Sequence, residues 1–258
     1  MAIFYKTDSQ IEQMYRAGQI VREVLEELGQ RVAPGVTTGE LDDKAQEICA
    51  KRNAKCLFKG YPGGFGAPPF PGAICASVNE EVVHGIPRAD RVLTEGDIIS
   101  VDFGVELDGW CGDAARTFLV GQVDPKVKKL VETTRRSLEI AVEMIPESQT
   151  WLPVAQAMQN FIENEGFSVV TDYVGHGIGK KMHEDPQIPN FVSQQLRRRD
   201  IKLRSGLVIA VEPMVNIGTH KCRTLDDGWT VVTADGKHSA HWENTIAITS
   251  SGVKLLTA

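Results

Sequence analysis

The sequence has 258 residues, of which 42% are hydrophobic and 24% charged, so it can bury a sizeable core and is neither fibrous, disordered nor of low complexity. Its formal net charge of -6 leaves no broad positive field to attract DNA or RNA, and we interpret the basic residues Arg197–Arg199, Lys202 and Arg204 as a solvated face rather than an RNA contact. Five scattered cysteines without a Cys-x-x-Cys pair argue against a disulfide framework and a structural zinc knot.

The first predicted element is a helix over Ser9–Leu28. Apolar residues recur there near helical spacing behind Ser9, which we expect to be the N-cap, with Glu12 three residues on. Charges along this segment argue against a signal or transit peptide, and no later stretch has the uncharged apolar length of a membrane span. We therefore expect a soluble, cytoplasmic protein.

Two predicted helix pairs follow the same plan. A break at 32–38 precedes a second helix around 41–49, and a third helix from Asp124-Pro125 toward Met144 is followed, after Ile145-Pro146, by a fourth from about Leu152 to Glu165. The repetition of helix, break and helix suggests two related halves.

Two apolar segments support this duplication. Residues 93–105 and 203–215 can be laid on each other at an offset of 110 residues (102 to 212), which aligns Asp102 with Glu212. Chance similarity of short strands would explain their shared valines but not the aligned acids. We expect an α/β (α+β) fold, a single catalytic domain over 1–258, with an N-terminal half at about 9–120 and a C-terminal half at about 124–250.

Four acids lie in or beside predicted apolar strands. Asp102 ends such a run, Asp113 follows an Asp108-Gly109 turn that should close a hairpin, Glu212 ends the repeat-equivalent strand, and Glu243 lies in the alternating segment 242–248. Burying unpaired carboxylates is costly, so four together require cations.

His176 adds a nitrogen donor to these oxygens. It is flanked by Gly175 and Gly177, which would let the backbone approach closely. Such a set suits Mn, Fe, Co or Zn, and five side chains are too many for one ordinary catalytic zinc, so two metal ions are expected. A two-metal site of this kind hydrolyses amides or esters.

Two further histidines, His84 and His183, have two interpretations. Either could be an ordinary hydrogen-bonded, partly buried side chain. His183 follows His176 by seven residues, and His84-Gly85-Ile86 echoes His176-Gly177-Ile178, so both could instead face the metals from outside their ligand sphere.

Five motifs together closely resemble the type I methionine aminopeptidases of the pita-bread metallopeptidase family, over nearly the whole chain. They are Asn79–Pro87, Asp102 with Asp113, Gly175–Glu184, Val211–Met214 and Asp227–Trp229. The resemblance implies two pseudo-symmetric helix-and-strand halves around a central antiparallel sheet. It also implies removal of the initiator methionine from nascent proteins, preferably when the second residue is small, by metal-activated water.

The same resemblance assigns roles to the residues. Asp102 would hold one metal, His176 and Glu212 the other, and Asp113 and Glu243 would bridge both. His183 would stabilise the oxyanion, His84 would bind the scissile amide, and Glu212 would also carry a proton to the leaving amine.

The resemblance further implies a methionine pocket and partners. The pocket would comprise Tyr61, Phe70, Cys75, Met182 and Trp229; the alternative for each is ordinary core packing, which is as good an interpretation for Cys75 taken alone. Nascent polypeptides would be the substrate, the ribosome is a candidate partner, and a monomer is favoured.

Residues 62–69 depart from the family pattern as a Gly- and Pro-rich insertion in the loop that should wall this pocket. We hypothesise that it alters pocket access or the second residues that are tolerated. Two alternative functions stay open, a proline-specific aminopeptidase or prolidase of the same fold and a non-catalytic binding protein of that fold.

Overall fold

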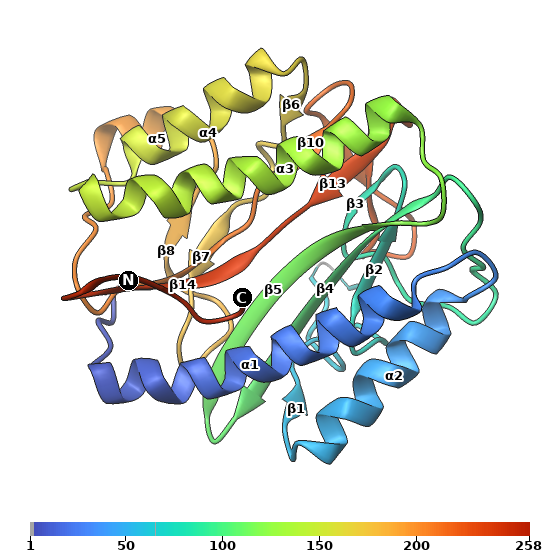
Figure 1. Cartoon of the computed structure of the whole chain (residues 1–258), viewed down its shortest axis with the longest axis horizontal. Helices are drawn as coiled ribbons and strands as arrows, with labels where there is room; N and C mark the ends of the chain where they lie inside the picture. The colour runs from blue at the N-terminus through green and yellow to red at the C-terminus, as the bar shows by residue number, and fades with distance from the viewer. Residues whose placement is uncertain (1–2, 65) are drawn as a thin grey trace.

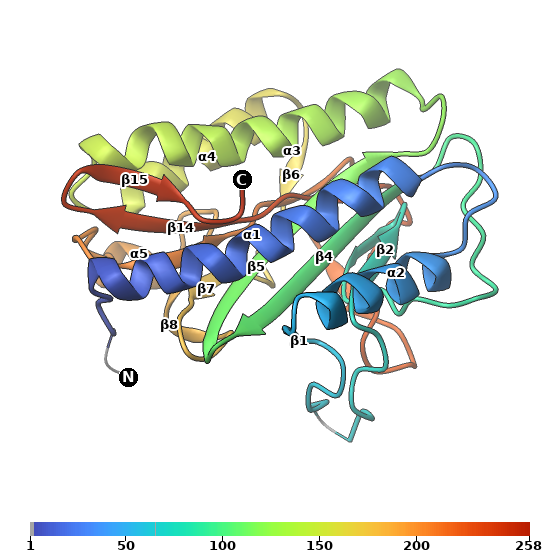
Figure 2. The same ribbon diagram turned by 60° about the horizontal axis from the view of Figure 1, so that its bottom comes forward.

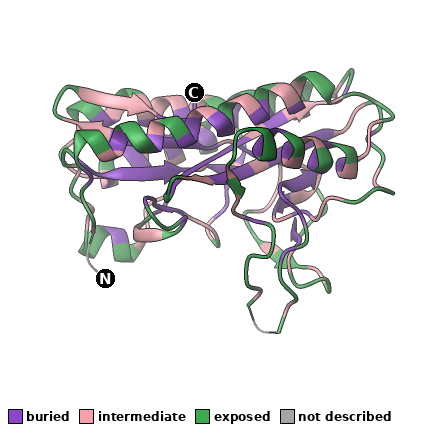
Figure 3. Cartoon of the chain, turned by 90° about the horizontal axis from the view of Figure 1, so that it is seen from below, coloured by how far each residue is buried: buried purple, intermediate pink, exposed green. Residues whose placement is uncertain are grey.

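The computed structural model describes residues 3–64 and 66–258. Its long helices form two pairs that lie along one side of the strands (Figures 1 and 2). They are α1 (Asp8–Arg31), α2 (Thr38–Lys51), α3 (Pro125–Met144) and α4 (Leu152–Asn164). Their outer faces are exposed and the strands beneath them are buried (Figure 3). The predicted repetition of helix pairs is confirmed.

The first helix is confirmed, but its predicted N-cap, Ser9, is wrong. Thr7 caps α1, because its side chain accepts a hydrogen bond from the N–H of Gln10 at 3.3 Å and its own N–H donates to the Gln10 side chain at 2.9 Å. This reciprocal capping box satisfies two orphan donors, and it places Ser9 inside the first turn.

Local chemistry accounts for the start of α3 and the end of α4. The Asp124 side chain accepts the N–H of Lys126 at 2.8 Å at the start of α3, where Pro125 occupies the first turn. A short 3₁₀ turn over Ile145–Glu147 separates α3 from α4, and Gly166 after α4 has φ +87°. A short helix, α5 (Gln194–Arg198), follows later in the chain.

The sheet of the N-terminal half is built around one hairpin. Strands β4 (Ile98–Leu107) and β5 (Trp110–Leu119) are joined by Asp108 and Gly109, whose φ angles of 52° and 80° confirm the predicted tight turn. Strand β4 also pairs with β1 (Lys55–Cys56) and with β2 (Cys75–Val78), where Cys75 lies opposite Asp102.

The C-terminal half contains a five-stranded sheet in the order β15-β14-β9-β7-β8. Its strands are β7 (Gly175–Gly177), β8 (Glu184–Ile188), β9 (Val208–Val211), β14 (Asn244–Thr249) and β15 (Gly252–Leu255). Two three-stranded sheets complete the fold, β13-β10-β6 and β11-β12-β3. These use β3 (Glu81–Val83), β6 (Ser168–Val169), β10 (Met214–Asn216), β11 (Cys222–Thr224), β12 (Val231–Thr233) and β13 (Ser239–His241). The assigned strand pairs are antiparallel, and the α/β class is confirmed.

The apolar core consists of several clusters, including one that combines residues of both halves. One cluster packs α1 and α2 against β2 and β4, and others pack α3 and α4 against the strands of the second half. The halves meet where the Glu243 N–H donates to the Ala115 carbonyl of β5 at 2.9 Å. Within the described residues, no helix is both long and apolar enough to cross a bilayer.

Candidate functional site

One cavity of about 220 Å³ at the junction of the halves collects every site residue that the sequence predicted. Its lining includes Tyr61, Phe70, Cys75, His84, Asp102, Asp113, His176, Met182, His183, Glu212, Trp229 and Glu243. These residues come from segments as distant as 61 and 243 in the chain, so only the folded domain brings them together.

The four acids are positioned by strands of both halves. Asp102 lies in β4 and Asp113 in β5, while Glu212 directly follows β9. Glu243 directly precedes β14, so the expectation that it lies within a strand is wrong by one residue. Asp113 and Glu243 are almost fully buried, at 4% and 2% exposure.

His176 is oriented by its own backbone. Its Nδ1 lies 2.9 Å from the Gly177 carbonyl, which can only accept, so Nδ1 carries the proton. The lone pair is then on Nε2, which lies 3.6 Å from the Glu212 carboxylate. A Cβ on Gly175 or on Gly177 would overlap a neighbouring carbonyl, which confirms the predicted close approach of backbone around this histidine.

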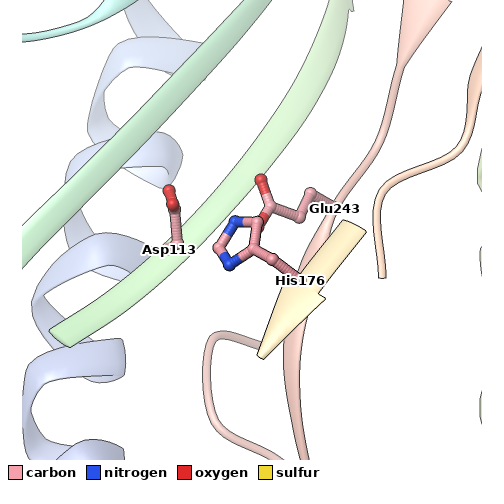
Figure 4. Close-up of side chains that lie close together, drawn as sticks. All are labelled: Asp113, His176 and Glu243. Atoms are coloured by element: carbon pink, nitrogen blue, oxygen red, sulfur yellow. The ribbon is translucent and has the colours of Figure 1, made fainter. Parts of the chain in front are cut away.

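The arrangement fits a divalent metal. One ligand atom each from Asp113, His176 and Glu243 lies within 4.8 Å of the others, and the three side chains converge (Figure 4). Asp102, Asp113 and Glu243 each keep a buried carboxylate oxygen that has no hydrogen-bond partner among the described residues. Buried oxygens without partners are costly, and a cation would satisfy them.

Burial gives the acids unusual protonation behaviour. Desolvation, followed by the charge of Asp113, raises the pKa of Asp102, Glu212 and Glu243 well above their usual values. Desolvation also raises the pKa of Asp113 to about 7. Without a metal, these carboxyls therefore hold their protons to a higher pH than exposed carboxyls do.

The histidines show the opposite effect. Burial lowers the pKa of His84 and of His176 to about 4 and lowers that of His183, so all three are neutral at pH 7. His183 Nδ1 lies 2.9 Å from the Tyr61 hydroxyl. The His84 ring makes an edge contact with Trp229, at 6.2 Å between centroids.

One end of the cavity is apolar. Phe70, Cys75 and Met182 form a buried cluster against which Trp229 packs, with 5.2 Å between the Phe70 and Trp229 ring centroids. The Trp229 indole donates to the Pro68 carbonyl at 2.8 Å, so the insertion at 62–69 contacts this wall. Residue 65 of that insertion lies outside the described residues.

Several lining residues were missed from the sequence, namely Phe58, Val83, Tyr173, Val174, Met214 and His241. His241 has the clearest chemistry. It is buried, its Nε2 lies 3.8 Å from Glu212 and makes no hydrogen bond within the described chain, and burial lowers its pKa to about 3. The sequence could have indicated His241, because it lies two residues before Glu243, and side chains two residues apart in an extended chain point to the same face.

Comparison with known proteins adds independent findings. A family model described as metallopeptidase family M24 matches residues 12–250. A methionine aminopeptidase of Clostridium acetobutylicum is 48% identical over 255 residues, which are 99% of this chain and 98% of the relative. The crystal structure of methionine aminopeptidase from Thermotoga maritima has a TM-score of 0.93, 44% identity and 99% coverage of both chains. The prolidase of Pyrococcus horikoshii has a TM-score of 0.73 at 20% identity, covering 98% of this chain but 63% of its own, a similarity of fold alone.

Proposed function

The chain belongs to metallopeptidase family M24, and from this membership we propose that it is a metalloaminopeptidase that removes the N-terminal methionine from proteins and peptides. The observation that carries the proposal is the single cavity in which metal-ligand candidates, neutral histidines and an apolar cluster meet. Relatives aligned over their full length are methionine aminopeptidases, so the prolidase alternative is not favoured. The intact set of acids with His176 likewise disfavours a non-catalytic binding protein.

We assign the metal site to Asp102, Asp113, His176, Glu212 and Glu243. These side chains would hold two divalent ions, which supply Lewis acidity for amide hydrolysis when bound. The candidates are Co, Mn, Fe and Zn, because a set of four carboxylates and one imidazole suits all of them. Asp113 and Glu243 are assigned as shared ligands, in keeping with their deep burial and their free oxygens.

The remaining residues would bind the substrate and move its protons. The methionine side chain would pack among Phe70, Cys75, Met182 and Trp229, where aromatic rings and sulfur suit a thioether. His183, fixed by Tyr61, would donate to the oxygen that gains charge.

Two groups would handle the scissile amide. His84, which burial keeps neutral, would hydrogen-bond that amide without adding a charge to the cavity. Glu212, which lines the same cavity, would take a proton from the attacking water and pass it to the leaving amine. We propose that a monomer carries out this reaction in the cytoplasm, on nascent chains near the ribosome.

A peptidase assay tests the proposal. Metal-free protein is titrated with each candidate metal and supplied with Met-Ala-Ser, a Leu-leading counterpart and an Xaa-Pro peptide. We expect release of methionine from the first peptide in preference to the others. Preferred cleavage of the Xaa-Pro peptide, or no methionine release with any metal, would refute it. Light scattering and ribosome co-sedimentation check the monomer and the ribosome separately.

A further inference from the structure

A second, larger cavity of about 670 Å³ opens next to the first. Both cavities are lined by Val174, His176 and His183, so they adjoin at the metal-ligand candidate His176. The outer cavity, here called the outer cleft, is about three times the volume of the inner one. It has room for a stretch of chain rather than a single side chain.

The wall of the outer cleft is formed by two segments that are distant in sequence. Phe4 and Tyr5 precede α1, and the stretch from Lys180 to Asp185 runs into β8, at the same end of the molecule (Figure 2). The Lys6 ammonium fixes the two segments together, because it forms a buried ion pair with Glu184 at 2.8 Å. This ion pair therefore holds the two segments of the wall in place.

The cleft exposes apolar surface where soluble proteins usually cover it. Phe4 and Tyr5 are 66% and 44% exposed, and Tyr61 of the adjoining inner cavity is 36% exposed. These are three of the four exposed large hydrophobic residues among those described. Apolar side chains grouped in a concave site are typical of binding surfaces.

The exposed charges in the cleft are positive. Lys180 and Lys181 are exposed, and the Lys180 ammonium lies 5.5 Å from the centre of the Trp110 ring. Of the acids in the wall, Glu184 is paired with Lys6 and Asp185 is half-buried. The cleft therefore offers a peptide an apolar wall and two available ammonium groups.

We propose that the outer cleft binds the third to fifth residues of the substrate polypeptide, and that Lys180 and Lys181 favour acidic side chains there. The inference rests on the proposed function, since a methionine in the inner cavity would direct the rest of its chain past the lining residues that the two cavities share. Exposed ion pairs contribute little individually, so the expected preference is about three- to tenfold in kcat/KM.

Four peptides test the inference. Met-Ala-Ser reports the basic reaction. Met-Ala-Glu-Glu-Ser-Gly, Met-Ala-Gln-Gln-Ser-Gly and Met-Ala-Lys-Lys-Ser-Gly carry negative, neutral and positive third and fourth residues, and Glu and Gln also match in shape. The kcat/KM of each hexapeptide is divided by the value that the same protein gives with Met-Ala-Ser. We expect this ratio to be highest for the Glu peptide, lower for the Gln peptide and lowest for the Lys peptide. The difference should shrink as salt is raised, because exposed charges are screened.

A charge reversal identifies the residues responsible. Lys180→Glu with Lys181→Glu should invert the order, whereas the matched reversal Lys126→Glu with Lys128→Glu, on exposed positions of α3, should keep it. Equal values for the three hexapeptides, or an order that the Lys180 and Lys181 reversal leaves unchanged, would overturn the inference. Failure of the wild-type protein to cleave Met-Ala-Ser would instead refute the proposed function, so the two failures are distinguishable.

Discussion

The Thr245 hydroxyl makes two hydrogen bonds to the backbone of Asp113. It accepts the Asp113 N–H at 3.1 Å and donates to the Asp113 carbonyl at 2.7 Å. Thr245 is fully buried in β14, two residues after Glu243, whereas Asp113 lies in β5. This hydroxyl therefore helps to hold together the two strand regions that carry the carboxylates we assign as shared metal ligands.

Replacing Thr245 with valine keeps the side-chain shape and removes both bonds. The Asp113 N–H and carbonyl would be left without this partner, which costs about 1–3 kcal/mol for each buried group that stays unsatisfied. We expect a lower free energy of unfolding in urea and weaker metal binding. Thr245→Ser, which keeps the hydroxyl, is the control, and equal stability of the valine and serine variants would contradict the prediction.

His176→Ala should abolish activity by removing a metal ligand. Removing a side chain that only hydrogen-bonds a metal ligand typically lowers metal affinity by roughly 10–100-fold. We expect the loss of the ligand His176 itself to lower it by more, while the circular dichroism spectrum stays native. His220→Ala, at an exposed histidine, is the matched control. A His176→Ala protein that binds metal as tightly as the wild type would remove His176 from the ligand set.

Metal binding should release protons and strengthen as pH rises. The raised pKa values mean that Asp113, at about 7, and the other three acids hold protons that a metal must displace. His176, at about 4, is already neutral and releases none above pH 6. Calorimetry in buffers of different ionisation enthalpy measures the release. Affinity independent of pH between 6 and 8 would argue against the assignment.

The same pKa shifts determine whether the stability of the metal-free protein rises or falls with pH. A carboxyl with a raised folded pKa contributes stability that is fully present below its unfolded value, about 4, and lost as pH rises through the folded value. Buried histidines act oppositely, but above about pH 7.5 they are almost fully neutral in both states. Urea unfolding from about pH 7.5 to 8.5 should therefore show falling stability. Asp113→Asn, which removes a charge that raises the pKa of the other three acids, should flatten the slope.

His84→Ala should impair catalysis without removing metal. We expect kcat to fall by about 100-fold or more, the usual size of a lost proton-handling group, at unchanged metal stoichiometry. Tyr61→Phe, which removes only the hydroxyl 2.9 Å from His183, should cost less. Loss of bound metal in His84→Ala would show that His84 supports the ligands instead.

The insertion at 62–69 should influence selectivity through Trp229. Deleting it removes the Pro68 carbonyl that accepts the Trp229 indole N–H, so the apolar wall should shift. Rates on methionyl peptides with Gly, Ala, Val or Leu as second residue should then change unequally. Trp229→Phe removes the same hydrogen bond and keeps a ring. An unchanged rate profile in the deletion would refute a role for the insertion.

Much of the fold could be predicted because its signals are local. Helical spacing and proline breaks located α1 to α4, and Asp108-Gly109 located the central hairpin, since positive φ angles favour such residues. The cap of α1 was misplaced because Thr7 and Ser9 both lie near the start of the helix, and the reciprocal bonds between Thr7 and Gln10 distinguish them.

The site residues likewise fall into those that the sequence reveals and those that it does not. Acids beside apolar strands are visible in a sequence because charge is unexpected there, and they converge in one cavity. Phe58, Val83 and Met214 are not visible, because an apolar residue that lines a cavity has the same pattern as one that fills a core. The outer cleft is hidden for another reason, since it depends on residues before α1 packing against residues before β8.

The division of the ligand candidates between the halves has a mechanical consequence. Asp102 and Glu243 are 141 residues apart in the chain (102 to 243), and a metal held by both would act as a removable cross-link closing that loop. Constraints on long loops remove the most chain entropy in principle, and a ligand that binds only the folded state stabilises it by mass action. The metal supply would then govern how long the folded chain survives proteases as well as how fast it works.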